Sequence, residues 1–163
     1  MSDYIIRPLD KEDNLQVMEI FNYYVENSFA AYPQEKLPLP FYDMLLASYQ
    51  GYPHAAAVTR GELAGFGGLR AYSPISTFRK TAEVSYFLSP VHTGKGLGSA
   101  LLQHLADGAT QSGIECLLAS ISSLNEASLR FHEKHGFERC GQLKRVGCKN
   151  GMEFDVIYMQ RFI

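Results

Sequence analysis

The fold is decided by one stretch of the sequence, Gly94-Lys95-Gly96-Leu97-Gly98-Ser99, which lies between a β-type run and a helical pattern. Glycines at such a junction let the backbone approach a ligand closely, and the helix start offers free N–H groups and a positive dipole end. The residues before the helix and its first turn contain no Asp or Glu, while Lys95 adds a positive charge. The stretch therefore predicts an anion site, most simply for phosphate. A tight strand-to-helix turn without a ligand is the alternative.

The spacing of the glycines argues against two familiar phosphate sites. A P-loop requires four residues between its first glycine and Gly-Lys-Ser/Thr, and that spacing is absent. A dinucleotide fold requires a third Gly or Ala where Ser99 stands, and its acidic residue belongs at the end of the next strand. Glu115 lies at the start of that strand instead, so a nicotinamide dinucleotide is disfavoured.

Upstream of the glycine stretch the pattern alternates between helices and strands. We expect a short opening strand, a helix capped by Asp10, a second short helix, a β-hairpin and one further strand, at residues 5–7, 10–27, 41–49, 55–70 and 81–88. Four apolar positions are expected to form the buried stripe of the first helix: Leu15, Met18, Phe21 and Val25.

Downstream of the glycine stretch we expect a helix, a buried strand, a second helix and a hairpin. Leucines four residues apart predict a helix that ends before Gly113, and residues 114–121 read as a strand. Ser123 and Glu126 match a capping box that opens a helix ending at Gly136. Asn150-Gly151 is the strongest hairpin turn in the chain. The order predicts an α+β fold with a mixed sheet covered by helices.

The helix predicted after Ser123 carries a polar stripe. Asn125, Ser128, Leu129 and His132 follow i, i+3, i+4, i+7 spacing and share one face. Ala127 and Phe131 are expected nearer the opposite, core-facing side. Such a stripe could contact a ligand. Alternatively, Asn125 is a solvated residue and His132 hydrogen-bonds a backbone carbonyl.

Two of these segments together resemble the GNAT N-acetyltransferases. The motif Thr93-x-x-Gly96-x-Gly98, preceded by residues 83–90, resembles the acyl-CoA loop of that family, and residues 125–137 resemble its second cofactor motif. Thr93 departs from the usual Gln or Arg, so the resemblance implies binding chiefly through backbone N–H groups.

Within that family the sequence is most similar to the phosphinothricin acetyltransferase-like branch. This similarity depends on Glu83-Val-Ser, on His132, and on the tail Gly147-x-Lys149-x-Gly151-x-x-x-Asp155. Glu153 stands where an aromatic residue is often found, which affects the identity of the substrate. The resemblance implies a GNAT-type acyl-CoA N-acyltransferase fold, a mixed and largely antiparallel sheet flanked by helices, and acetyl-CoA as co-substrate without a metal.

The resemblance also implies where the coenzyme binds. The backbone of Tyr86, Phe87 and Leu88 would pair with the pantetheine arm as an added strand. The pyrophosphate would bind at Gly94, Lys95, Gly96, Leu97, Gly98 and Ser99, and the pantetheine region would contact Asn125 and Ser128.

The implied reaction is attack of an amine on the acetyl thioester. Glu83 is the expected general base, and the Leu88 N–H is expected to stabilise the oxyanion. His132 either protonates the departing thiolate or only orients a group. Alternatively, Glu83 is an edge-strand charge that discourages aggregation.

The acceptor is expected to be a small amino-acid-like amine of the phosphinothricin, methionine sulfone or methionine sulfoximine type. Arg79 could clamp its carboxylate, Arg70 is a weaker candidate, and Phe29, Tyr32 and Tyr72 could line the pocket. A peptide or protein amine is the alternative acceptor. A binding module that senses acyl-CoA without turnover is the alternative outside enzymes.

The composition limits the remaining possibilities. Fifteen basic and 17 acidic residues give a net charge of −2, which provides no field for nucleic acid, and no apolar run approaches the roughly 20 residues of a membrane span. Three cysteines without a CxxC pair suit a reducing cytoplasm, and the five histidines form no metal-ligand cluster. We therefore expect a single cytoplasmic domain over residues 1–163, and the resemblance implies a homodimer.

Overall fold

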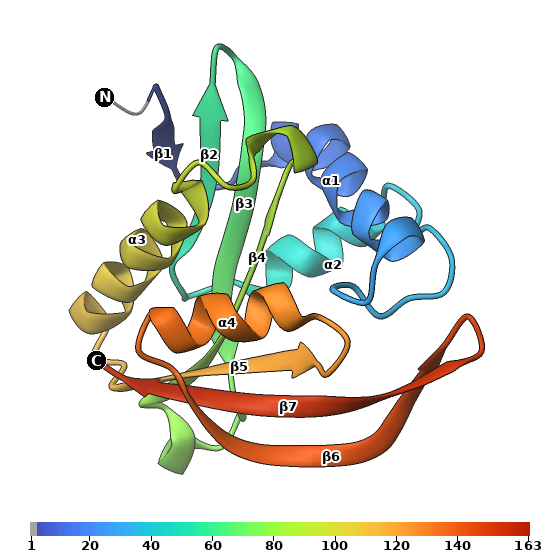
Figure 1. Cartoon of the computed structure of the whole chain (residues 1–163). Coiled ribbons are helices and arrows are strands. Elements are labelled where there is room, and N and C mark those ends of the chain that lie inside the picture. Colours follow the sequence, from blue (N-terminus) through green and yellow to red (C-terminus); the bar gives the residue numbers. More distant parts are fainter. Residues whose placement is uncertain (1–2) are drawn as a thin grey trace.

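A seven-stranded sheet forms the centre of the computed structural model, which describes residues 3–163 (Figure 1). Its strand order is β1-β2-β3-β4-β5-β7-β6, and only the β4–β5 pair is parallel. The strands are β1 (Ile5–Arg7), β2 (His54–Thr59), β3 (Glu62–Ala71), β4 (Thr81–Leu88), β5 (Cys116–Ser122), β6 (Glu138–Lys149) and β7 (Met152–Phe162). The mixed, largely antiparallel sheet predicted from the sequence is confirmed.

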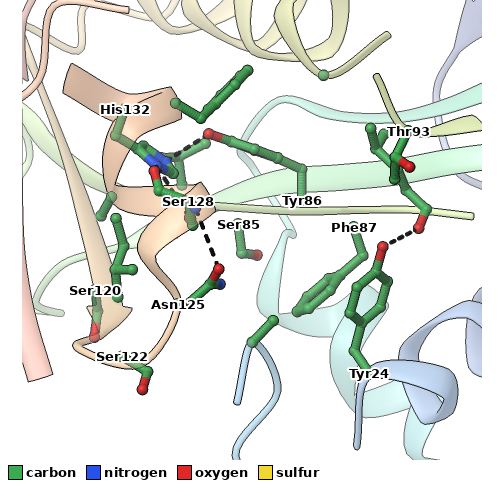
Figure 2. Close-up of a pocket in the computed structure, with 17 residues that line it drawn as sticks. Tyr24, Ser85, Tyr86, Phe87, Thr93, Ser120, Ser122, Asn125, Ser128 and His132 are labelled. Atoms are coloured by element: carbon green, nitrogen blue, oxygen red, sulfur yellow. Dashed lines mark hydrogen bonds between the residues drawn. The ribbon is translucent and has the colours of Figure 1, made fainter. Parts of the chain in front are cut away.

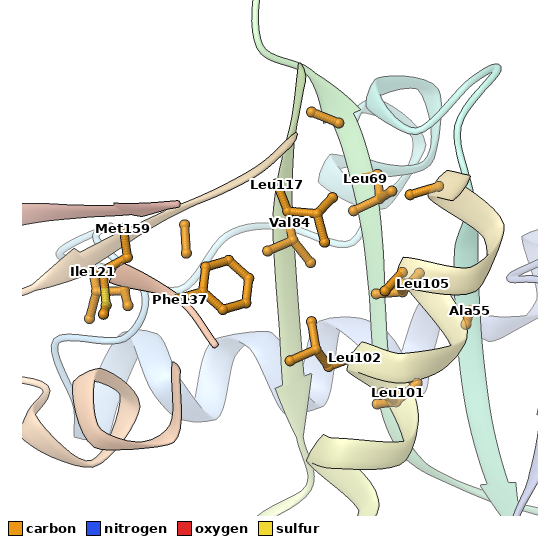
Figure 3. Packing of buried hydrophobic residues seen from close by; sticks show 14 of the residues in the cluster. Ala55, Leu69, Val84, Leu101, Leu102, Leu105, Leu117, Ile121, Phe137 and Met159 are labelled. Atoms are coloured by element: carbon orange, nitrogen blue, oxygen red, sulfur yellow. The ribbon is translucent and has the colours of Figure 1, made fainter. Parts of the chain in front are cut away.

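Four α-helices cover the sheet: α1 (Asn14–Asn27), α2 (Phe41–Ser48), α3 (Leu97–Gln111) and α4 (Glu126–Lys134). One core cluster joins α3 and α4 to the strands, as Figure 3 shows for Leu101, Leu102 and Leu105 of α3. A second cluster joins α1 and α2 to β2 and β3, and it includes Val17 and Phe66. The two clusters lie on opposite faces of the sheet because successive side chains of a strand alternate between faces.

The first helix begins as expected but buries a different stripe. Asp10 and Asp13 form a capping box at the 3-10 turn that precedes α1. The expected stripe is wrong at Leu15, whose side chain is 67% exposed. Val17 and Ile20 are buried instead.

The start of α4 also differs from the expectation. Asn125, not Ser123, is the N-cap, and its Oδ1 accepts a hydrogen bond from the Ser128 N–H at 3.3 Å. The Ser123 hydroxyl instead accepts from the Asp155 N–H on β7 at 2.9 Å. Serine and asparagine can both cap a helix. Because the β7 main chain binds the Ser123 hydroxyl, Asn125 caps α4 instead.

The Asn150-Gly151 hairpin and the end of α4 form where the sequence predicts them. The Asn150-Gly151 turn has positive φ angles of 52° and 75°, and it joins β6 to β7. Positive φ at both turn residues is the requirement of a type I′ hairpin, which this pair of residues meets easily. Gly136 follows α4 with a φ of 83°, as expected for a helix stop.

The two central strands β4 and β5 separate soon after they begin. Their parallel pairing joins Thr81, Ala82 and Glu83 to residues 116–118 and then stops. Beyond that point β4 and β5 run apart (Figure 1), while β4 stays in regular register with β3 as far as Leu88. Because β4 lies between β3 and β5, the alternative that Glu83 is an edge-strand charge is wrong.

Glycine at position 68 of β3 makes room for a buried tyrosine. The ring of Tyr49 is 1% exposed, and a Cβ built on Gly68 would lie 2.6 Å from it. The Tyr49 hydroxyl lies 3.2 Å from the Ser85 Oγ on β4. The absence of a side chain at Gly68 therefore lets a helix-side aromatic ring rest directly on the sheet.

We expect Gly68→Ala to lower the free energy of unfolding by about 1–3 kcal/mol, because the added methyl group overlaps the Tyr49 ring. Gly141→Ala is the matched control, since its Cβ would meet only the Tyr158 Cβ at 3.9 Å. We expect this control to change stability by less than about 0.5 kcal/mol. Urea unfolding of both variants measures the difference, and equal midpoints would contradict the packing argument.

Candidate active site

A cavity of about 310 Å³ opens where β4 and β5 separate, and side chains from both faces of the sheet line it (Figure 2). The α3–α4 face contributes aromatic and polar groups, including Tyr86, Asn125, Ser128, Phe131 and His132. The α1 face contributes Tyr24, Ala30, Ser85 and Phe87. The cavity thus runs through the sheet, and two ligands could reach it from opposite sides.

The main chain of β4 offers unpaired polar groups to this cavity. The Ser89 N–H donates to the Ala64 carbonyl at 2.8 Å, so the polar groups of Ser89 point toward β3. Since these groups alternate along a strand, those of Tyr86 and Leu88 point away from β3, into the gap left by β5. Alternation directs the main chain of Phe87 toward β3 instead, so only the ring of Phe87 is available there.

The carbonyl of Leu88 confirms this direction. It accepts a hydrogen bond from the Tyr24 hydroxyl of α1 at 2.6 Å, so its partner is a helix side chain and not β3. Burial raises the pKa of Tyr24, so the phenol is a stable donor at neutral pH. The Leu88 N–H lies on the same side of the strand as its carbonyl, facing the cavity.

The glycine stretch closes one end of the cavity. Gly94 and Gly96 have φ angles of 72° and 82°, and Gly96 is the N-cap of α3. Within residues 3–163, no side chain caps this helix and no acidic residue lies in its first turn. Thr93 and Gly98 line the cavity, so the free N–H groups at the start of α3 lie beside it.

Ser99 and Lys95 make contacts that the sequence did not indicate. The Ser99 hydroxyl lies 2.8 Å from the Nε2 of His135, which connects the first turn of α3 to the end of α4. The Lys95 Nζ donates to the Val91 carbonyl at 2.9 Å and is otherwise at the surface. Both residues belong to the stretch that the sequence singled out.

The polar stripe of α4 faces the cavity. Asn125, Ser128 and His132 line it, while Leu129 beside them is buried in the core. The expectation that Ala127 lies on the core-facing side is wrong because Ala127 is exposed. Phe131, placed on that same side, also lines the cavity. The stripe is thus the inner face of α4.

His132 is 5% exposed and has a defined protonation pattern. Its Nδ1 lies 2.7 Å from the Ser128 carbonyl, which can only accept, so Nδ1 carries the hydrogen. Its Nε2 lies 2.6 Å from the Tyr86 hydroxyl. Burial lowers the pKa of His132, the carbonyl of Ser128 opposes this, and His135 adds to it. At neutral pH the imidazole is therefore uncharged, with a bare Nε2.

Glu83 lies on the face of β4 that carries Ser85 and Phe87, outside the cavity lining. Arg70 of β3 binds its Oε2 through Nε and Nη2, both at 2.8 Å, while among residues 3–163 Oε1 accepts no hydrogen bond. Two residues of strand separate Glu83 from Ser85, about 7 Å. One or two water molecules could bridge that distance.

The residues expected to bind the acceptor divide into two groups. Phe29 and Tyr32 pack on Phe154 of β7, with ring centroids 5.8 and 5.6 Å apart, close to Ala30 of the cavity. Tyr72 and Arg79 lie on the connection between β3 and β4 and do not line the cavity. Arg70 is paired with Glu83, so its guanidinium is not a free clamp.

A buried lysine fixes the segment that follows α1. Lys149 is 1% exposed, and its Nζ donates to the carbonyls of Val25, Ser28 and Ala31 at 2.6, 2.7 and 2.7 Å. Burial lowers the pKa of Lys149. The three carbonyls accept from all three N–H groups of the Lys149 ammonium. Lys149 of β6 thereby fixes the segment that contains Ala30, which lines the cavity.

Sequence reasoning missed several groups that line the cavity: Tyr24, Ala30, Thr93 as a lining residue, Ser120 and Ser122. The serines of β5 carry no local signal, since their exposure depends on β4 moving away. Tyr24 lies on the predicted first helix but outside its expected apolar stripe. Among residues 3–163, no three or more His, Cys, Asp or Glu side chains form a potential metal site. No helix in that range is long and apolar enough to cross a membrane.

Comparison with known proteins identifies the family. The model of the Acetyltransferase (GNAT) family matches residues 17–137. This chain therefore belongs to the GNAT family, and it is an N-acetyltransferase.

Individual relatives indicate the branch. The chain is 34% identical to an L-methionine sulfoximine/L-methionine sulfone acetyltransferase of Salmonella typhimurium, over 95% of this chain and 92% of that protein. It is 31% identical to a phosphinothricin N-acetyltransferase of Streptomyces viridochromogenes, over 96% and 86%. A phosphinothricin acetyltransferase of Sinorhizobium meliloti, solved in complex with acetyl-CoA, superposes with a TM-score of 0.92 at 29% identity, covering 99% and 89%. The predicted likeness to the phosphinothricin branch and the predicted fold are confirmed.

The lowered pKa of His132 predicts an acid-dependent loss of stability. Between its folded pKa and the unfolded value of about 6.5, the unfolded chain binds more protons, so the free energy of unfolding falls as the pH falls. We expect His132→Gln to make this fall smaller between about pH 7 and about pH 5. The exposed His104 supplies the control variant His104→Gln. Urea unfolding across that range gives the slopes, and identical slopes for wild type and His132→Gln would contradict the assignment.

Proposed function

We propose that this enzyme transfers the acetyl group of acetyl-CoA to the amine of a small amino-acid-like acceptor. The proposal depends mainly on the cavity through the sheet. The Leu88 N–H faces this cavity, and the free N–H groups at the start of α3 lie beside it. The relatives named for methionine sulfoximine, methionine sulfone and phosphinothricin support this class of acceptor.

The residues present fit acetyl-CoA. An extended arm could pair with the free main-chain groups of Tyr86 and with the N–H of Leu88, as an added strand in the gap beside β4. A diphosphate would meet the N–H groups of Gly94, Gly96 and Gly98 and the positive end of α3, with Lys95 nearby. Asn125 and Ser128 would border the arm from α4.

Glu83 is the proposed general base. An alkyl amine with a pKa of about 10.4 is only about 0.04% neutral at pH 7, so removing its proton accelerates the reaction. The Glu83 Oε1 could take that proton through water along Ser85, while Arg70 holds Oε2 in place.

The Leu88 N–H is the proposed oxyanion donor. It faces the cavity because its strand position points away from β3, and the Tyr24 hydroxyl fixes the Leu88 carbonyl beside it. A donor fixed before the reaction stabilises developing negative charge without reorganisation.

The acceptor would enter from the α1 face. Ser85, Ser120 and Ser122 offer hydroxyl groups there, and Phe29 with Tyr32 forms an aromatic wall beside Ala30. A role for Arg79 or Tyr72 would require the β3–β4 connection to close over the cavity.

We further propose that residues 1–163 act as one cytoplasmic domain that forms a homodimer. The edge strand β6 supports the dimer, because ten of its 12 residues are exposed. Leu143 and Val146 are exposed apolar residues on this strand. An exposed edge of this length is a surface that a second copy could cover.

A thiol-release assay with acetyl-CoA tests the proposed function. We expect release of CoA with methionine sulfone, methionine sulfoximine or phosphinothricin, and far less release with short peptides. Release with peptides alone would favour a protein amine as the acceptor. Binding of acetyl-CoA without release by any amine would favour the sensor.

Glu83→Gln tests the base. We expect kcat to fall by about 10²-fold at pH 7, because the amide cannot accept the amine proton, while the KM for acetyl-CoA stays within about twofold. Glu115→Gln is the control, since Glu115 is an exposed carboxylate paired with Lys80 outside the cavity. Equal kcat values for Glu83→Gln and wild type would contradict the role of Glu83.

A further inference from the structure

Tyr86 and His132 form a hydrogen-bonded pair in the cavity, brought together from β4 and α4. The Tyr86 hydroxyl and the His132 Nε2 are 2.6 Å apart, and Figure 2 shows the bond directed between the two side chains. The rings are stacked, with centroids 5.6 Å apart and an interplanar angle of 22°. Tyr86 and His132 are 46 positions apart in sequence, so no local pattern indicates this pair.

The hydrogen positions of this pair have one consistent arrangement at neutral pH. The His132 Nδ1–H donates to the Ser128 carbonyl, which leaves Nε2 as an acceptor for the Tyr86 O–H. Neutral His132 therefore has no proton on Nε2 with which to protonate a thiolate directly. The expected role of His132 as an acid requires that it first receive a proton.

We infer that Tyr86 and His132 form a proton relay that carries the proton of the amine to the sulfur of the departing thiolate. This inference rests on the proposed function. In it Tyr86 is the catalytic residue, because its hydroxyl meets the reacting atoms, and His132 acts through Tyr86 as a positioning residue and proton store.

The relay balances in two steps. Glu83 takes one proton of the ammonium form before attack, as proposed above. As the resulting neutral amine nitrogen bonds to the acetyl carbon, one of its N–H protons passes to the Tyr86 oxygen while the Tyr86 proton passes to the His132 Nε2. As the carbon–sulfur bond breaks, the Nε2 proton returns to the Tyr86 oxygen and the phenol proton passes to sulfur. One N–H and one C–S bond are replaced by one N–C and one S–H bond, and the pair returns to its initial state.

The surroundings suit a temporary imidazolium. The Nδ1–H bond to Ser128 persists in the charged form, and His132 lies in the last turn of α4, where the helix dipole favours a cation. The ionisable groups that act on it are Tyr86 from β4 and His135 from the end of α4. Phe131 and Phe137 contact it only with their rings, at centroid distances of 5.5 and 5.0 Å. Burial disfavours a lasting charge, so the proton is returned readily.

Tyr86→Phe removes the hydroxyl and keeps the ring. We expect kcat to fall by about 10²-fold, with the KM for acetyl-CoA within about twofold of wild type. Tyr4→Phe is the matched control, because the Tyr4 hydroxyl also contacts a histidine, His92 Nδ1 at 3.2 Å, outside this cavity. We expect Tyr4→Phe to retain wild-type kcat.

The double variant distinguishes a relay from two independent effects. We expect His132→Gln to lose about as much kcat as Tyr86→Phe, and the double variant to lose no more than either single one. The wild-type kcat should also decline at a pH lower than the ordinary histidine value of about 6.5, because burial lowers the pKa at which His132 becomes charged, and Tyr86→Phe should lack this decline. Losses that multiply in the double variant, or a Tyr86→Phe kcat within about twofold of wild type, would overturn the relay.

A measurement without turnover separates this inference from the proposed function. We expect the nitrogen-15 resonance of the His132 Nε2 to change in Tyr86→Phe and to remain unchanged in Tyr4→Phe. An unchanged resonance in Tyr86→Phe would overturn the pair itself. If the wild-type chain released no thiol with any amine, the proposed function would fail and the relay with it. Wild-type activity with an unaffected Tyr86→Phe would refute the relay alone.

Discussion

The site depends on the separation of two parallel strands. β4 and β5 pair over three residues, Thr81 to Glu83, and then diverge, so the main-chain groups of Tyr86 and Leu88 lose the partner that a parallel neighbour would supply. Unpaired main-chain groups inside a protein are costly unless a ligand or water satisfies them. The same divergence that costs pairing energy therefore opens the cavity and leaves it lined with groups that need a ligand.

Alternation along β4 then separates two chemical roles on one strand. Glu83, Ser85 and Phe87 point to the face covered by α1 and α2, while Tyr86 and Leu88 point to the face covered by α3 and α4. The proposed base thus lies on one face, and the phenol–imidazole pair of the proposed relay lies on the other. The register with β3 is regular through this region, so the alternation is not interrupted.

The segments that face the cavity are held by contacts from distant parts of the chain. Lys149 on β6 fixes the carbonyls of Val25, Ser28 and Ala31, and Tyr24 fixes the Leu88 carbonyl. In the sequence, Lys149 is only one residue of the C-terminal motif that resembles the phosphinothricin branch. Its neighbours in the sequence do not indicate that its side chain is buried. Ser123 was misassigned for the same reason, since the main chain of the neighbouring strand β7 binds its hydroxyl.

Local backbone preferences and helical spacing were enough to predict the helices and strands, the glycine stretch at the start of α3 and the polar stripe of α4. The sequence also carried enough of two motifs to indicate the family. The contacts of Arg70 with Glu83 and of Tyr86 with His132 became visible only in the folded chain. The reason is physical: each of these pairs joins residues on different elements, and their distance depends on how the sheet and the helices pack, which no local pattern records.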